Sequence, residues 1–190
     1  MGLRQAIDRQ LWAPRSQKHM WQRSAVRYFF DAYRGLNFLV RQQFVDPKRV
    51  AVMGFSQGGW ITLSSVERGA IEQASANKFR AAAAIYPLCN PIKGPMAVPT
   101  LIMIGECDDW TAADACRKLA AGQDDLGTSR PEDAAIQLIV YPKRSSRYDL
   151  AYLQTPVTFL GHHLEFNKSA TYQSTDALRE FLRSMVGDRP

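Results

Sequence analysis

A glycine–serine–glycine motif directly after an apolar run is the feature that most constrains this chain. Positions 54–58 read Gly-Phe-Ser-Gln-Gly, and positions 49–53 before them read Arg-Val-Ala-Val-Met. This order predicts a strand, a sharp turn with Ser56 at its tip, and a helix, which is typical of a nucleophile elbow. We expect the glycines at 54 and 58 to be required because side chains there would collide with neighbouring backbone. An ordinary glycine-rich turn is the alternative.

Length and composition predict one globular domain in the cytoplasm. The chain has 190 residues, of which 46% are hydrophobic, and no apolar run approaches the length of a membrane span. Its first twenty residues are polar and basic, so they do not resemble a signal peptide. The odd set of Cys89, Cys107 and Cys116 favours reduced thiols. We expect no metal site, because the spacing of histidines and cysteines does not resemble one, and no cofactor.

The basic charge of the chain is concentrated near its start. The formal net charge is +6, and most of the excess of Lys and Arg falls within positions 1–49. A basic, nucleic-acid-associated protein is one reading of this end. However, these arginines alternate with apolar residues at helical spacing, which favours a solvated helix face. Nucleic acid is therefore not an expected partner, and neither is a membrane.

Hydrophobic periodicity divides the chain into an irregular segment, 1–17, and a single domain, 18–190. The patterns predict helices over 18–44, 57–68, 112–121 and 169–186, and strands over 50–53, 79–86, 100–105 and 136–141. Strands that alternate with helices indicate an α/β fold, with a mostly parallel sheet of about four strands flanked by helices. Positions 142–168 show no clear period, and so long a loop is typical of a functional segment or a lid.

Three motifs in this order resemble those of the dienelactone hydrolase family of α/β hydrolases. They are Gly-Phe-Ser-Gln-Gly-Gly at 54–59, Gly-Glu-Cys-Asp-Asp-Trp-Thr at 105–111, and Val-Tyr-Pro at 140–142 before the last helix. The resemblance implies a nucleophile, an acid and a histidine in that chain order. It places Ser56 on the nucleophile and Asp108 on the acid, with Asp109 as a second candidate acid. It also implies a partial α/β-hydrolase fold, because the chain begins near the helix that precedes the elbow.

The histidine motif departs from the family pattern. The family has Tyr-Pro-Gly-x-x-His-x-Phe after the last strand, whereas positions 141–148 read Tyr-Pro-Lys-Arg-Ser-Ser-Arg-Tyr. Ser146 therefore occupies the place of the histidine, and a serine cannot act as a general base near neutral pH. His162 or His163, further along the same stretch, could fold back toward Ser56, and we take His162 as the predicted base. The alternative is that both are surface or locally bonded histidines.

The oxyanion hole and the sheet edge are also incomplete in this sequence. The backbone N–H of Gln57 is one predicted donor, and the second is expected from an earlier strand-to-helix loop that nothing before Gly54 provides. In the family the elbow strand pairs with an earlier strand, so here it should form an apolar edge. Such an edge could pair with another chain, which makes a homodimer a possible state.

These features predict a serine hydrolase, weakened or incomplete. Its reaction would be hydrolysis of a small-molecule carboxylic ester or lactone through an acyl-Ser56 intermediate. The alternative is a catalytically inactive α/β-hydrolase remnant that acts as a binding or interaction module.

Overall fold

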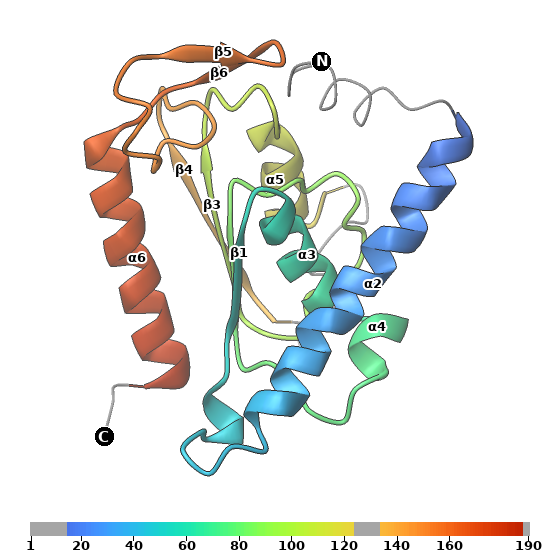
Figure 1. Ribbon diagram of the computed structural model, residues 1–190. Helices are drawn as coiled ribbons and strands as arrows, with labels where there is room; N and C mark the ends of the chain where they lie inside the picture. The colour runs from blue at the N-terminus through green and yellow to red at the C-terminus, as the bar shows by residue number, and fades with distance from the viewer. Residues whose placement is uncertain (1–14, 124–133, 188–190) are drawn as a thin grey trace.

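The computed structural model describes residues 15–123 and 134–187 (Figure 1). The predicted irregular segment therefore lies outside the described residues as far as residue 14. Its helices are α2 (Arg15–Leu39), the short 3-10 helix η1 (Pro47–Arg49), α3 (Gln57–Val66), α4 (Ala70–Gln73), α5 (Ala113–Ala120) and α6 (Lys168–Val186). Its strands are β1 (Val52–Phe55), β2 (Ala82–Ile85), β3 (Thr100–Gly105), β4 (Ile136–Tyr141), β5 (Val157–Phe159) and β6 (His162–Leu164).

Four parallel strands form the main sheet, in the order β1-β2-β3-β4. Helix α6 lies on one face of this sheet, and α2, α3 and α5 lie on the other (Figure 1). The predicted α/β class, the parallel sheet and the number of its strands are confirmed. The first helix begins at Arg15 and ends at Leu39, so it starts and stops earlier than predicted.

The centre of the sheet is apolar apart from Thr100, because helices cover both of its faces. Every residue of β2 and β3 is buried, from Ala82 to Ile85 and from Thr100 to Gly105. A strand buried on both faces reads as a continuous apolar run rather than as an alternating pattern. The alanine run at 81–84 would suit a helix by itself, but its position between two other strands makes it a strand, as predicted.

Strand β1 is an edge of the sheet, as the sequence predicted. The N–H groups of Val52 and Ser56 donate to carbonyls at the β2 side, at 3.0 and 2.9 Å. The intervening backbone of Met53 and Phe55 therefore faces the open side. The side chains of these two residues are 44% and 45% exposed. Pairing of two copies through this edge stays a prediction.

The cysteines differ from the prediction of three reduced thiols. Cys89 and Cys116 form a disulfide, with sulfur atoms 2.02 Å apart, while Cys107 is free and exposed rather than packed at the strand end. Cys89 follows β2 and Cys116 lies on α5, so only the crossover topology brings the pair together. The cytoplasmic location inferred from reduced thiols loses that support. Among the described residues, no helix is long and apolar enough to cross a membrane.

The aperiodic stretch contains a small antiparallel hairpin of β5 and β6. The hairpin lies at the end of the main sheet where β1 runs into α3 (Figure 1). Both strands have only three residues, too few to produce a recognisable alternation in the sequence. The other unpredicted element is α4, a single turn.

Candidate functional site

Ser56 lies at the tip of a sharp turn between β1 and α3. Its φ is 53° and its ψ is −118°, a conformation that side-chain-bearing residues rarely adopt. The turn is held from both sides, because the Ser56 N–H donates to the Ile85 carbonyl at 2.9 Å and the Trp60 N–H donates to the Ser56 carbonyl at 3.1 Å. The Ser56 hydroxyl does not cap α3, so it is available at the helix N-terminus.

The glycines around Ser56 are not equally crowded. A Cβ at Gly54 would lie 2.2 Å from the Gly58 carbonyl oxygen, so the expected collision is confirmed there. A Cβ at Gly58 would have no neighbour within 4 Å, so the same expectation is wrong at that position. Gly59 is the second crowded position, since a Cβ there would lie 3.0 Å from the Pro87 Cβ and 3.2 Å from the Ile85 oxygen.

Asp108 lies in the loop after β3, with its carboxylate buried and only half satisfied. Oδ1 accepts hydrogen bonds from the N–H groups of Trp110 at 3.0 Å and Thr111 at 2.8 Å. Oδ2 is buried and has no hydrogen-bond partner among the described residues. Burial raises the pKa of Asp108, and the Thr111 N–H and the nearby Ser146 hydroxyl oppose this rise. In a catalytic triad, such an acid accepts a hydrogen bond from the imidazole of the base.

The loop after β4 brings Ser146 to this acid. Ser146 is 3% exposed and pairs with Leu164 of β6 through an isolated bridge. The loop can approach because Gly105 has no side chain: a Cβ there would lie 2.3 Å from the Arg144 carbonyl oxygen. That same oxygen accepts a hydrogen bond from the Cys107 N–H at 2.8 Å. Ser146 therefore lies beside Asp108, where the resemblance implied a histidine.

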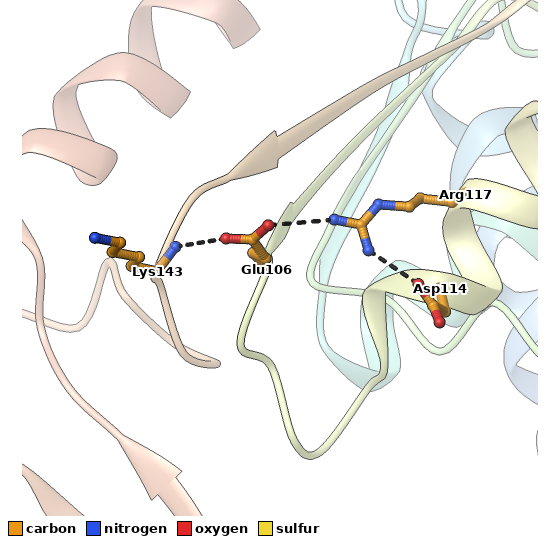
Figure 2. A network of polar contacts seen from close by, with 4 residues as sticks. All are labelled: Glu106, Asp114, Arg117 and Lys143. Carbon is orange, nitrogen blue, oxygen red and sulfur yellow. Dashed lines mark hydrogen bonds and ion pairs between the residues drawn. The ribbon is translucent and has the colours of Figure 1, made fainter.

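A polar network holds the start of the loop after β4 against the loop after β3, which carries Asp108 (Figure 2). The Lys143 N–H donates to Glu106 at 3.0 Å, and Arg117 of α5 lies 3.8 Å from the other Glu106 oxygen. Arg117 also pairs with Asp114 at 2.9 Å. Lys143 has a φ of 54°, and it stands where the family pattern has glycine.

The two histidines of the hairpin bind the residue after Asp108. His162 Nδ1 lies 3.5 Å from Asp109 Oδ1, and its ring stacks on Trp110 with centroids 4.6 Å apart. The His163 N–H donates to Asp109 Oδ2 at 3.0 Å, and its ring faces Glu165 at 3.2 Å. Within the described part of the chain, neither imidazole forms a hydrogen bond with Ser56. His162 as the base stays a prediction.

Aromatic rings connect the elbow strand to the loop after β4. The Tyr86 ring, directly after β2, lies 6.0 Å from the Phe55 ring and 5.9 Å from the Tyr148 ring. Burial raises the pKa of Tyr86, and the adjacent Asp149 carboxylate raises it further. Sequence reasoning missed both Tyr86 and Asp149. The only signal for Tyr86 is its place at the end of a predicted strand, while Asp149 lies in the aperiodic stretch and has none.

The role of the Gln57 N–H as an oxyanion-hole donor stays a prediction. Gln57 is the first residue of α3, so its N–H has no carbonyl of a preceding helical turn to bind. The described residues before β1 comprise α2, η1 and their connections, so they include no strand-to-helix loop that could supply the second donor.

Parts of this chain match a known protein family and a known protein. The prolyl oligopeptidase family matches residues 17–94. Acylamino-acid-releasing enzyme 2 of Oryza sativa subsp. japonica is 27% identical over 154 residues, which cover 79% of this chain and 17% of that protein.

Solved structures share the fold. A puromycin-hydrolysing peptidase of Mycobacterium tuberculosis superposes with a TM-score of 0.60 at 18% identity, over 86% of this chain and 26% of that chain. A candidate dienelactone hydrolase of Klebsiella pneumoniae subsp. pneumoniae MGH 78578 gives 0.57 at 15% identity, over 81% and 59%. The chain has a partial α/β-hydrolase fold. It spans about a sixth of the rice relative and about a quarter of the peptidase.

These matches support the α/β-hydrolase superfamily. Membership of the dienelactone hydrolase family, which is a finer assignment, stays a prediction.

Proposed function

We propose that this chain is a serine hydrolase domain in which Ser56 accepts an acyl group from a carboxylic ester or lactone, with slow turnover. The observation that carries the proposal is the elbow itself. A serine with a φ of 53° is held between β1 and α3, with its hydroxyl not used as a helix cap. Backbone strain of this kind persists only where the surroundings enforce it, and it is concentrated at functional sites.

The reaction would proceed in two steps. Ser56 Oγ attacks the ester carbonyl carbon as its proton passes to the base, or to solvent water where no base reaches it, and the carbonyl becomes an oxyanion. The C–O bond to the alcohol then breaks, and the alcohol leaves with a proton returned by the base or by water, which gives acyl-Ser56. The Gln57 N–H at the start of α3 stabilises the oxyanion, helped by the positive end of the helix dipole. Water then attacks the acyl carbon, which releases the carboxylic acid and restores the Ser56 hydroxyl.

Slow turnover follows from the environment of Asp108. General-base catalysis contributes about 10²–10⁴-fold, and Ser146 beside Asp108 has no group that accepts a proton near neutral pH. His162 is the remaining candidate base, and Asp109 is the carboxylate that it binds. Its role requires that the hairpin bring the imidazole within hydrogen-bond reach of Ser56.

Esters suit this site better than the amides that peptidases cleave. An amine leaving group must be protonated as it departs, which in a complete triad is done by the imidazolium. An alcohol, and above all a phenol, leaves more readily without that proton. The names of the matched relatives include peptidases, so an amide substrate is tested beside the ester.

The test is labelling with a fluorophosphonate probe, followed by hydrolysis of p-nitrophenyl acetate and of an acyl-amino-acid p-nitroanilide. We expect slow labelling that Ser56→Ala abolishes and that Ser184→Ala, an exposed serine of α6, leaves unchanged. His162→Ala and His163→Ala, made separately, show whether either imidazole speeds the labelling. Folded protein that never labels would instead support the inactive binding module.

A further inference from the structure

The connection between β2 and β3 is joined to α5 by the disulfide of Cys89 and Cys116. This connection, residues 86–99, contains no helix, whereas the other two connections of the main sheet carry α3, α4 and α5. The buried side chains of Ile92 and Met96 anchor its second half, and the disulfide anchors its first half. A segment without regular secondary structure opens more readily than a helix, so a covalent link strongly affects its stability.

The first residues of this connection lie against the first turn of α3. Cys116 Sγ is 3.9 Å from the Pro87 carbonyl oxygen. Pro87 also lies so close to Gly59 of α3 that a Cβ at position 59 would be 3.0 Å from the Pro87 Cβ. Pro87 therefore lies between the disulfide and the helix that begins directly after Ser56.

Tyr86 begins the connection in a strained conformation. Its φ is 38°, a value that residues with side chains rarely adopt. Its N–H donates to the Met103 carbonyl at 2.6 Å, and its carbonyl accepts from the Thr111 hydroxyl at 3.3 Å. Its ring lies 6.0 Å from the ring of Phe55, the residue before Ser56. Strain of this kind persists only where the surrounding structure enforces it, and the disulfide three residues later is one such constraint.

Cys89 is the half of the disulfide that a reductant meets first. It lines a cavity of about 490 Å³ between the connection and the start of α5, where Asn90, Lys93 and Ala115 are among the other lining residues. Cys89 is 3% exposed, whereas Cys116 is fully buried. A thiolate in the cavity attacks Cys89 Sγ when the connection opens locally, with Cys116 Sγ as the leaving group.

We propose that the Cys89–Cys116 disulfide is a redox switch that fixes the connection after β2 and, through it, the turn at Ser56. A dithiol reductant supplies two electrons and two protons. Its first thiolate forms a mixed disulfide with Cys89 while Cys116 leaves as a thiolate, and its second thiol then displaces Cys89. The products are two protein thiols and the cyclic, oxidised reductant. Without the cross-link, Tyr86 and Pro87 relax and the turn at Ser56 loosens.

Reduction by dithiothreitol, followed by reoxidation, tests the switch on the unmodified chain. Alkylation in denaturant should modify Cys107 alone before reduction and all three cysteines after it. Reduction should lower the melting temperature by roughly 10 °C, because the bond joins residues 27 apart in sequence. Hydrogen exchange of the Ser56 and Tyr86 amides should become about tenfold faster, while the Gly187 amide at the end of α6 should not change. Reoxidation should reverse each change.

The effect on reactivity rests on the proposed function of Ser56. Fluorophosphonate labelling should be about tenfold slower in the reduced protein, because the serine is then less well positioned. Cys89→Ala and Cys116→Ala should each behave as the reduced protein does and no longer respond to dithiothreitol. Cys107→Ala removes an exposed free thiol and is the matched control that should leave the response unchanged.

Two results would overturn the inference. One is alkylation of all three cysteines before reduction, and the other is a reduction that changes neither the melting temperature nor the exchange of the Ser56 and Tyr86 amides. Reduction of the unmodified chain decides the matter even if Cys116→Ala does not fold. Protein that never labels, but whose structure responds to reduction as described, would contradict the proposed hydrolase function and support the switch.

Discussion

The elbow after β1 and the loop after β4 lie at the two edges of the same sheet, and they differ in backbone geometry and in side-chain chemistry. The elbow has both the strained backbone and Ser56, the residue that we propose as the nucleophile. The loop after β4 reaches Asp108, the proposed acid, but it brings Ser146 there, where the resemblance implied a histidine. The comparison shows that the course of a loop and the chemistry of its side chains are specified separately.

The separation has a physical basis in the contacts of each region. Backbone groups hold the loop after β4, through Gly105, the Cys107 N–H and the Lys143 N–H, and none of these contacts involves the side chain at position 146. A different side chain at position 146 would leave these contacts in place. At the elbow, by contrast, Gly54 and Ser56 belong to one tight turn, so the backbone geometry and the position of the Ser56 hydroxyl depend on the same contacts.

Ser146→His should have the largest effect, because it tests whether the loop after β4 still presents a working position. The imidazole would meet the unpartnered Asp108 Oδ2 and could then accept the Ser56 proton. We expect fluorophosphonate labelling of Ser56 to become about 10²–10⁴-fold faster. Ser145→His, one residue away, is the control and should give no comparable gain. An unchanged labelling rate would mean that the loop no longer reaches Ser56.

Gly54→Ala and Gly58→Ala test how tightly the elbow is built. The Gly54 change forces a methyl group against the Gly58 carbonyl and should cost about 3 kcal/mol of unfolding free energy. The Gly58 change meets open space on a helix and should stabilise the protein by about 0.5 kcal/mol. Urea denaturation measures both. Equal losses for the two variants would contradict the difference in crowding.

Asp108→Asn tests the cost of keeping a charge beside Ser146. Burial raises the pKa of Asp108, so the folded state holds the proton more tightly than the unfolded state does. Stability should therefore fall as the pH rises from the ordinary carboxyl pKa through the raised one. The variant should gain about 1 kcal/mol at pH 7, and this gain should disappear below about pH 4. A gain independent of pH, or one shared by the exposed Asp176→Asn, would rule out this explanation.

Lys143→Gly should have the smallest effect, on the loop after β4 alone. Lys143 holds a φ of 54°, which glycine adopts without steric cost. Replacement should raise the melting temperature by about 1 °C, corresponding to roughly 0.3 kcal/mol, because the relief at the backbone is partly offset by the greater freedom of glycine in the unfolded chain. Lys93→Gly, at a position with no positive φ, is the control and should be neutral or destabilising. A loss of stability in the first variant would show that the Lys143 side chain contributes more than its backbone conformation costs.

Much of the fold follows from local patterns. The runs that became β2, β3 and β4 were predicted because strands in a covered parallel sheet carry few polar residues on either face. Gly187 ends α6 with a φ of 76°, a conformation that favours glycine after the last turn of a helix. The site was only partly predictable: Ser56 and Asp108 stand in motifs with fixed spacing, and their catalytic roles stay predictions.

Other features depend on segments that are distant in sequence. Gly59 is crowded by Pro87, Cys89 reaches Cys116, and Asp149 meets the start of α6 only after the strands have assembled. Residue type and spacing predict where a chain turns and which face of an element is buried. They do not predict which side chains that are distant in sequence come into contact. Folding therefore decided the disulfide and the half-satisfied Asp108, while the elbow and the alternation of strands with helices were already visible in the linear chain.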